Sequence, residues 1–191
     1  MTMKRDQMLR ALARHRTDEV VVAVYRAANE LIHIDPSELN YTFNAAMGQG
    51  SSAALGLALA RPDRRVIVLD GDGSLLMQLG SLATVAGAAP ANYTHVLFAN
   101  GVYQTSGSQA IPGAGAVDFA GMAEAAGYAF TTRIDTLEEL RIRLPELLSV
   151  KGPVLVELAV EEAELTPMTA PGGDPLRVQV ERLRGRLADG D

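Results

Sequence analysis

Short, uninterrupted runs of apolar residues recur along the chain and predict the strands of a buried sheet. The runs are Glu19–Tyr25, Arg65–Asp70, Thr94–Ala99, Ala129–Ile134 and Pro153–Val160. Apolar runs without polar alternation are typical of strands that are covered on both faces. Parallel sheets have this property, because helices pack on each side of them.

Segments with helical character lie between these runs. The predicted helices are Ser51–Ala60, Ser74–Ala89, Phe119–Gly127, Thr136–Val150 and Leu176–Leu187. Pro62 and Pro90 follow the first two and end them. Thr136 and Glu139 form a capping box at the start of the fourth, and Pro145 within it predicts a kink or an early end.

Strands that alternate with helices predict βαβ crossovers. The fold class is therefore α/β, a three-layer α/β/α arrangement around a parallel sheet. We predict a single domain over residues 1–191, with a core at about 19–160 and a C-terminal tail and helix at 161–191.

Composition and charge narrow the functional classes. The 191 residues are 48% hydrophobic and 21% charged, which is typical of a folded protein, and the formal net charge of −6 argues against a nucleic-acid binder. A group of basic residues near the start is interpreted as the solvated face of a short helix. These residues are Lys4, Arg5, Arg10, Arg14 and Arg16.

The chain contains no cysteine, so disulfides and thiolate metal sites are excluded. No apolar run approaches the roughly 18 residues of a membrane span. The N-terminus also lacks the pattern of a secretory signal, so we expect a cytoplasmic protein.

Two of the predicted strands are followed by loops suited to binding a phosphate and a metal. The first loop reads Asp70-Gly71-Asp72-Gly73-Ser74 and leads into a helix. Its glycines allow a tight turn and a close approach of a ligand, and the start of the helix together with the Ser74 hydroxyl predicts a diphosphate site. Because like charges repel, Asp72 would face that diphosphate only with a cation between them.

The second loop, Ala99-Asn100-Gly101-Val102, offers the other oxygen ligands. In an open parallel sheet both loops lie at the carboxyl edge, where ligands bind. A carboxylate, an amide oxygen, a backbone carbonyl and phosphate oxygens suit octahedral Mg²⁺.

These loops resemble the metal–diphosphate motif of thiamine-diphosphate-dependent enzymes. Asn100 follows 28 residues after Asp72, and Ala99 replaces the first asparagine of the family's pair. The resemblance implies that the Asp72 and Asn100 side chains and the Val102 carbonyl bind Mg²⁺. It also implies that Gly71, Gly73 and Ser74 hold the diphosphate of the cofactor.

An upstream segment, Ala45-Ala46-Met47-Gly48, looks like the G-S-M-G segment of the same family. The resemblance implies that Met47 holds the cofactor bent and that the Ala45 carbonyl accepts a hydrogen bond from its 4′-amino group. Gly48 belongs to the same cofactor-binding segment. Alanines at 45 and 46 depart from the family pattern, although backbone contacts survive such a change.

The loop after Asn100 narrows the resemblance to the β subunits of sulfopyruvate and phosphonopyruvate decarboxylases. Their pattern, D-N-G-x-x-x-S-T-G-x-Q, is matched at Gly101, Gly107 and Gln109, with Thr105-Ser106 in place of Ser-Thr. We predict that Thr105 and Ser106 contact the diphosphate or the substrate.

The resemblance covers only one of the two modules that such enzymes need. It implies a small 2-oxo acid as substrate, an aldehyde and CO₂ as products, and thiamine diphosphate with Mg²⁺ as cofactors. No catalytic residue is expected in this chain, because a separate pyrimidine-module (α) subunit should supply the activating glutamate, in an α2β2 or larger hetero-oligomer. A carboligase subunit resembling acetolactate synthase stays an alternative. A further alternative is a subunit that is not itself an enzyme and only holds the cofactor or has a regulatory role.

A dinucleotide-binding protein is a further alternative. Gly48-x-Gly50-x-x-Ala53, with Asp70 ending a strand 20 residues after Gly50, nearly fits the Rossmann fingerprint. That fingerprint needs a strand directly before its first glycine, and residues 41–47 make a poor one. The chain also has no room for a substrate domain.

The remaining polar residues are given structural interpretations. His33 is interpreted as structural, His15 as a surface residue and His95 as a residue that packs within a strand. The glutamates at 161, 162 and 164 are interpreted as a solvated acidic stretch.

Overall fold

A computed structural model describes residues 3–44, 46–162 and 174–188. It contains a six-stranded sheet in which all pairs of neighbouring strands are parallel. In sheet order the strands are β2 (Asn40–Phe43), β1 (Val20–Val24), β3 (Val66–Gly71), β4 (Tyr93–Ala99), β8 (Val154–Ala159) and β7 (Phe130–Ile134). A small antiparallel hairpin, β5 (Val102–Tyr103) and β6 (Gln109–Ala110), follows β4. The predicted parallel α/β class is confirmed.

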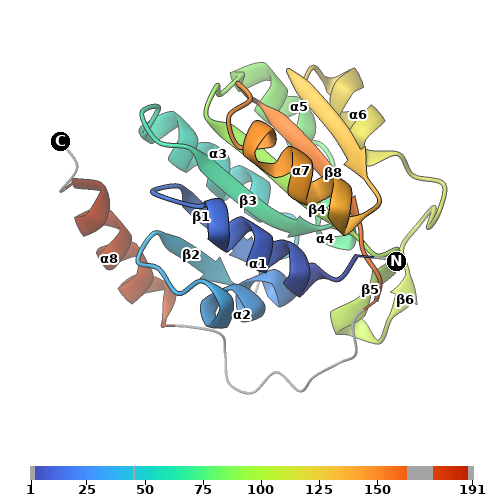
Figure 1. The fold of residues 1–191 in the computed structure, drawn as a ribbon, viewed down its shortest axis with the longest axis horizontal. Coiled ribbons are helices and arrows are strands. Elements are labelled where there is room, and N and C mark those ends of the chain that lie inside the picture. The colour runs from blue at the N-terminus through green and yellow to red at the C-terminus, as the bar shows by residue number, and fades with distance from the viewer. Residues whose placement is uncertain (1–2, 45, 163–173, 189–191) are drawn as a thin grey trace.

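Helices cover both faces of the sheet (Figure 1). One face carries α1 (Arg5–His15), α2 (Tyr25–Ile34) and α7 (Leu137–Leu147). The other carries α3 (Gly50–Ala60), α4 (Asp72–Leu76), α5 (Ser81–Ala88), α6 (Phe119–Ala126) and, near β2, α8 (Leu176–Ala188). The three predicted layers are therefore present.

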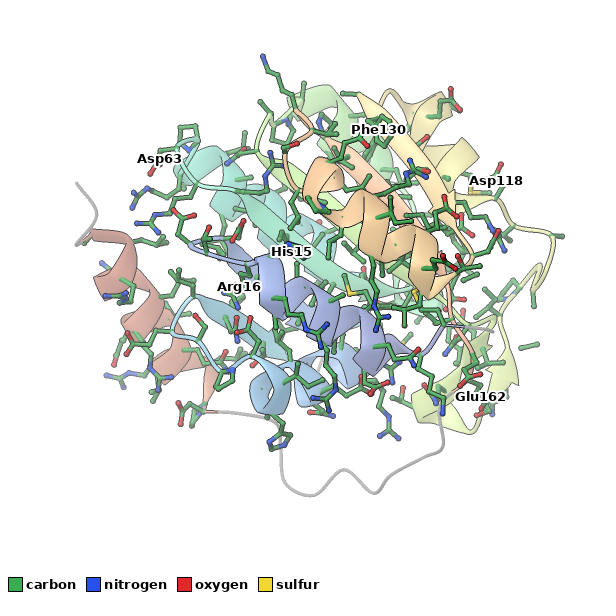
Figure 2. The ribbon with its side chains drawn as sticks, viewed as in Figure 1. His15, Arg16, Asp63, Asp118, Phe130 and Glu162 are labelled. Carbon is green, nitrogen blue, oxygen red and sulfur yellow. The ribbon has the colours of Figure 1, made fainter. Side chains whose placement is uncertain are left out.

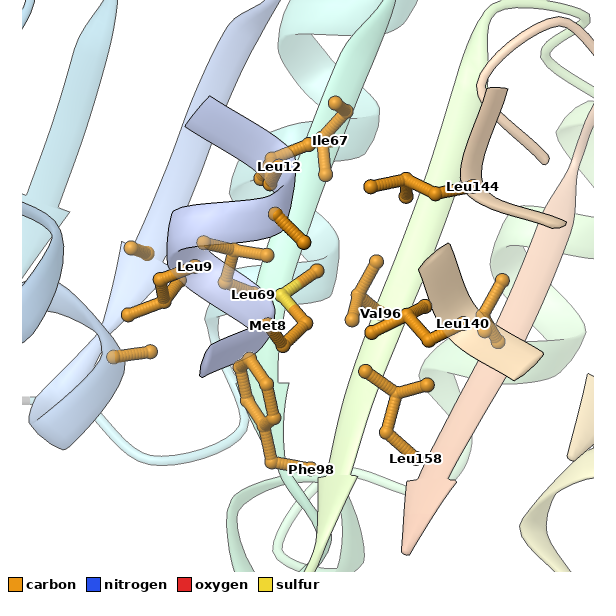
Figure 3. Packing of buried hydrophobic residues seen from close by; sticks show 14 of the residues in the cluster. Met8, Leu9, Leu12, Ile67, Leu69, Val96, Phe98, Leu140, Leu144 and Leu158 are labelled. Atoms are coloured by element: carbon orange, nitrogen blue, oxygen red, sulfur yellow. The ribbon is translucent and has the colours of Figure 1, made fainter. Parts of the chain in front are cut away.

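Successive residues of the strands point to opposite layers, as a pleated strand requires. In β3, Ile67 and Leu69 belong to the core under α1 and α7, whereas Val66 and Val68 belong to the core under α3. Figure 3 shows the first of these cores, where Met8 and Leu144 approach the sheet from two different helices. Burial on both faces explains why the strand sequences are apolar without alternation.

Several element boundaries differ from the sequence-based prediction. Ser74–Ala89 was expected to form one helix, but α4 and α5 are separate and residues 77–80 form turns between them. The first strand ends at Val24, because Tyr25 takes a φ of 51° and begins α2, a helix that was not predicted. In α7, Thr136 Oγ1 accepts from the Glu139 N–H at 3.2 Å, as predicted, and the helix ends at Leu147, two residues after Pro145.

The segment judged a poor strand does contain one, the edge strand β2. Its Thr42 is bonded by a side chain of α8: the Thr42 N–H donates to Gln179 Oε1 at 2.8 Å, and Gln179 Nε2 donates to the Thr42 carbonyl at 3.0 Å. The Gln179 amide thus takes the place of a neighbouring strand and closes an edge that would otherwise expose unpaired backbone groups.

The interpretation of the basic group was correct only in part. Lys4, Arg10 and Arg14 are exposed, but the side chains of Arg5 and Arg16 are buried against carboxylates. His33 was interpreted as structural, but it is exposed on α2. His15 is exposed and His95 is fully buried in β4, as predicted.

The acidic stretch is less uniform than predicted. Glu161 is partly buried and pairs with Lys4 at 3.4 Å, and Glu162 is exposed and contacts Ser108. Glu164 lies outside the described residues. Among the described residues, none of the helices has both the length and the apolar character needed to cross a membrane.

Candidate active site

A pocket lies over the carboxyl ends of β1, β3 and β4. From β1 the chain continues to β2 on one side, and from β3 it continues to β4 on the other. The pocket is therefore at the point where the strand order reverses. Ligands bind at such points in open parallel sheets, because the loops after two adjacent strands diverge there.

The pocket brings together most of the site residues predicted from the sequence. Those that line it are Met47, Gly71, Asp72, Gly73, Ser74, Asn100, Val102 and Thr105. Gly48 is buried beside them, and its N–H donates to Ser74 Oγ at 2.9 Å. Ser106 is exposed on the 3₁₀ turn Gln104–Ser106, and Ala45 lies outside the described residues.

Asp72 connects the two loops that the sequence singled out. Its Oδ1 accepts from the Gly73 N–H and its Oδ2 from the Gly101 N–H, each at 2.7 Å. The side chain is buried, and burial raises the pKa of Asp72, while the N–H donors of Gly101, Gly73 and Asn100 act in the opposite direction. A proton therefore competes with a cation for this carboxylate at a higher pH than it would at an exposed aspartate.

The Asn100 side chain shapes the second loop. Its Oδ1 accepts from the Val102 N–H at 3.0 Å, and the Gly101 carbonyl accepts from the Ile111 N–H at 3.0 Å. These bonds fold the start of the β5–β6 hairpin back over α4. Tyr103 of this hairpin packs directly on Gly73, since a Cβ at position 73 would lie 2.6 Å from the tyrosine ring.

The donor set fits Mg²⁺ together with a diphosphate. Within residues 3–44, 46–162 and 174–188, no group of three or more His, Asp or Glu side chains is placed to hold a metal ion. Asp72 and Asn100 would offer two side-chain oxygen ligands to a cation in this pocket. Mg²⁺ is typically held in this way, by one or two carboxylates with phosphate oxygens and water completing the octahedron.

Several residues that line the pocket were not predicted, among them Arg5, Tyr25, Arg26 and Gln104. The φ of 51° at Tyr25 is a left-handed conformation, which is uncommon for a bulky residue and costs on the order of 1–3 kcal/mol. No local sequence signal reveals these residues, because Arg5 resembles its basic neighbours and Tyr25 resembles the end of an apolar strand.

A buried polar pair lies behind the pocket. Asp70 and His95 are both fully buried, and His95 Nε2 is 3.7 Å from Asp70 Oδ2. Asp70 Oδ1 accepts from the Gly71 N–H at 2.9 Å, which fixes the first turn of the loop.

Most of the chain matches a known protein family. Residues 21–158 match the family described as thiamine pyrophosphate enzyme, C-terminal TPP binding domain. The chain belongs to this family. Thiamine pyrophosphate (TPP) is the cofactor also called thiamine diphosphate, so the resemblance seen in the sequence is confirmed. The match also favours TPP over a dinucleotide. β2 ends at Phe43, and Ala46 and Met47 belong to no strand, so the strand that the fingerprint needs directly before Gly48 is not found there.

Two curated relatives of this TPP domain differ in length. Phosphonopyruvate decarboxylase of Streptomyces viridochromogenes is 38% identical over 170 residues, which are 88% of this chain and 42% of that protein. Sulfopyruvate decarboxylase subunit beta of Methanothermobacter thermautotrophicus is 32% identical over 192 residues, which are 99% of this chain and 100% of that protein. The chain thus spans less than half of the first relative and all of the second.

A solved structure supports the fold. Thiamine diphosphate-dependent 4-hydroxybenzoylformate decarboxylase of Rhodococcus jostii superposes with a TM-score of 0.69 at 23% identity, covering 86% of this chain and 34% of that chain. At this identity the likeness bears on the fold alone.

Proposed function

We propose that this chain is the β subunit of a two-subunit, TPP- and Mg²⁺-dependent decarboxylase that converts a small 2-oxo acid into an aldehyde and CO₂. The observation that carries the proposal is the contact between the two motif loops. Asp72 of the first loop accepts the Gly101 N–H of the second at 2.7 Å, beside Asn100. Two segments with the spacing of the metal–diphosphate motif thus meet in one pocket.

We assign roles on this basis. Asp72, Asn100 and the Val102 carbonyl would hold Mg²⁺, and Gly71, Gly73 and Ser74 would hold the diphosphate. Met47, which is partly buried and lines the pocket, would support the bent cofactor, with Gly48 beside it and the Ala45 carbonyl on the amino group. Thr105 and Ser106 would contact the diphosphate or the substrate. The bound cofactor supplies the electron sink for decarboxylation.

A second subunit is part of the proposal. Full coverage of a protein named as a beta subunit, and coverage of 42% of phosphonopyruvate decarboxylase, support a chain that carries one of two modules. The α subunit would supply the pyrimidine module and the activating glutamate, in an α2β2 or larger assembly. We also propose that residues 1–191 form a single domain, and the cytoplasmic location stays a prediction.

The substrate class rests on the same relatives. Their names support a 2-oxo acid with a second acidic group, such as a sulfonate or a phosphonate. The carboligase alternative predicts a different product, a 2-hydroxy ketone in place of an aldehyde, so product analysis separates the two.

Calorimetric titration with TPP tests the proposal. TPP is titrated into this chain in Mg²⁺ and in EDTA, alone and after co-expression with the α subunit, and the complex is then assayed for CO₂ release from sulfopyruvate and phosphonopyruvate. We expect binding that requires Mg²⁺ and becomes tighter with the partner. Binding of NAD in place of TPP, or TPP binding that is equally tight in Mg²⁺ and in EDTA, would overturn the proposed function.

The Met47→Ala variant should separate cofactor binding from turnover. We expect TPP affinity to change by less than about threefold, because the diphosphate and the metal supply most of the binding, while kcat falls at least about tenfold because the cofactor is less well oriented. Calorimetry and initial rates measure the two effects. Leu59→Ala, at an exposed residue of α3, is the matched control and should leave both unchanged.

A further inference from the structure

We propose that Arg5 is a positioning residue of this site, which holds the loop of residues 101–111 in the geometry that the metal and the diphosphate require. The inference rests on the proposed function. It concerns a residue at the start of α1, outside both motif loops and far from them in the sequence.

Three elements meet at the Arg5 guanidinium. Its Nε and Nη2 donate to the two carboxylate oxygens of Glu30 in α2, at 3.0 and 2.7 Å. Its Nη1 lies 3.5 Å from Oε1 of Gln104, which is on the loop after the motif asparagine. The bidentate bond fixes the plane of the guanidinium, so that Nη1 is directed at Gln104.

The burial of this group indicates a role beyond stability. Arg5 is 7% exposed and Gln104 is 5% exposed, and both line the pocket. Burying an ion pair generally stabilises a fold no more than apolar side chains of the same size would. The arrangement is therefore better explained by the position that it imposes on its neighbours.

The backbone before Arg5 is itself fixed. Met3 is fully buried and forms a parallel bridge with Val160, just beyond β8, and the Glu161 N–H donates to the Met3 carbonyl at 3.0 Å. The N-terminal segment is therefore held beside the carboxyl end of β8, and Arg5 follows it at the start of α1.

A movement of Gln104 would be transmitted to the proposed ligands. Gln104 lies between Val102 and Thr105 in the sequence, and two backbone bonds close the loop around it, from the Ser108 N–H to the Tyr103 carbonyl and from the Ile111 N–H to the Gly101 carbonyl. Because the loop is short and closed, loss of the Arg5 contact should loosen it as a unit.

Hydrogen–deuterium exchange of the full, ligand-free chain tests the inference without catalysis. We expect Arg5→Met to speed exchange of the amides of residues 101–111 about tenfold, because a hydrogen bond from a charged group is lost. Arg5→Lys should have an intermediate effect, since one ammonium cannot bond Glu30 twice and still reach Gln104.

Two further variants separate position from stability. The double variant Arg5→Met/Glu30→Leu removes both charges, so no partly buried carboxylate is left unpaired, and the loop should still exchange faster than in the wild type. Arg16→Met is the matched control, because the Arg16 side chain is as buried as that of Arg5, pairs with Asp35 at 2.7 Å and lies just past the other end of α1 (Figure 2). It should lower the melting temperature and leave the loop unchanged.

Titration with TPP and Mg²⁺ completes the test. If the wild type binds, we expect about tenfold weaker binding in Arg5→Met and in the double variant, and wild-type affinity in Arg16→Met. The inference would be overturned by wild-type exchange and affinity in Arg5→Met and in the double variant. It would also be overturned if Arg16→Met loosened the loop as much as Arg5→Met does. Failure of the wild type itself to bind would instead contradict the proposed function.

Discussion

Replacing Asp72 with alanine should weaken Mg²⁺-dependent binding of TPP by at least about 100-fold, because Asp72 is the one carboxylate that we assign to the metal. Without Mg²⁺ the variant and the wild type should bind equally weakly. Calorimetric titration in Mg²⁺ and in EDTA measures both differences.

The Asp72→Ala chain should remain folded. Two N–H groups, those of Gly73 and Gly101, lose their acceptor. The loss of a buried carboxylate, whose raised pKa reflects the cost of its burial, acts in the opposite direction. We expect a net change in the free energy of unfolding within about 2 kcal/mol, measured by urea denaturation.

A single and a double substitution, which keep the size of the side chains, provide the controls for this variant. Asp72→Asn should lose metal-dependent binding as well, and Asp72→Asn/Asn100→Asp, which moves the carboxylate to the neighbouring loop, should recover part of it. Unchanged affinity in Asp72→Ala, with a wild type that binds, would remove Asp72 from the metal site.

The fold could be predicted where local pattern and tertiary environment agree. Strands such as β3 and β4 are buried on both faces, so their sequences are apolar throughout and separate clearly from the helices around them. The meeting of Asp72 and Asn100 followed from the same reasoning, because the carboxyl ends of adjacent parallel strands lie at one edge. Prediction of the site therefore depended on the topology of the sheet.

The elements that were missed depend on contacts that are distant in the sequence. The strand β2 is short and partly polar, and its edge is closed by Gln179, 137 residues from Thr42. The break between α4 and α5 covers residues 77–80, of which only Gly80 is a poor helix former. For β2, a contact distant in the sequence outweighs local propensity.

The pocket residues that were not predicted were missed for the same reason, because their contacts are distant in the sequence. Arg5 looked like one member of an exposed basic group, yet its partners are Glu30, 25 residues away, and Gln104, 99 residues away. An arginine among other basic residues is expected to be exposed to solvent, and only the fold shows that Arg5 is buried. Resemblance to a family identified the motif loops, and it carried no information about the residues that support them from α1 and α2.

The contact between Gly73 and Tyr103 leads to the second large expected effect. A Cβ at position 73 would lie 2.6 and 2.7 Å from Cδ1 and Cε1 of the Tyr103 ring, and 3.3 Å from Cγ2 of Ile111. Real Cβ atoms do not approach ring carbons so closely. Gly73→Ala should therefore displace Tyr103 and, with it, the hairpin that begins with Val102.

We expect Gly73→Ala to lower the free energy of unfolding by about 1–3 kcal/mol through overpacking, although alanine is the better helix former by about 1 kcal/mol. TPP affinity in Mg²⁺ should fall at least about tenfold, because the displaced loop carries a proposed metal ligand. Urea denaturation and calorimetry measure the two effects. Gly71→Ala is the matched control for stability, since no heavy atom lies within 4 Å of its added methyl group.

Removing the Tyr103 ring should remove most of the destabilisation that Gly73→Ala causes. In a Tyr103→Ala background, the additional effect of Gly73→Ala on the free energy of unfolding should shrink to within about 0.5 kcal/mol, because the two residues interact directly and their effects are not additive. An equal cost in both backgrounds would mean that the methyl group is excluded by something other than Tyr103. The close approach of this ring to Gly73 would then no longer explain why the position between Asp72 and Ser74 requires glycine.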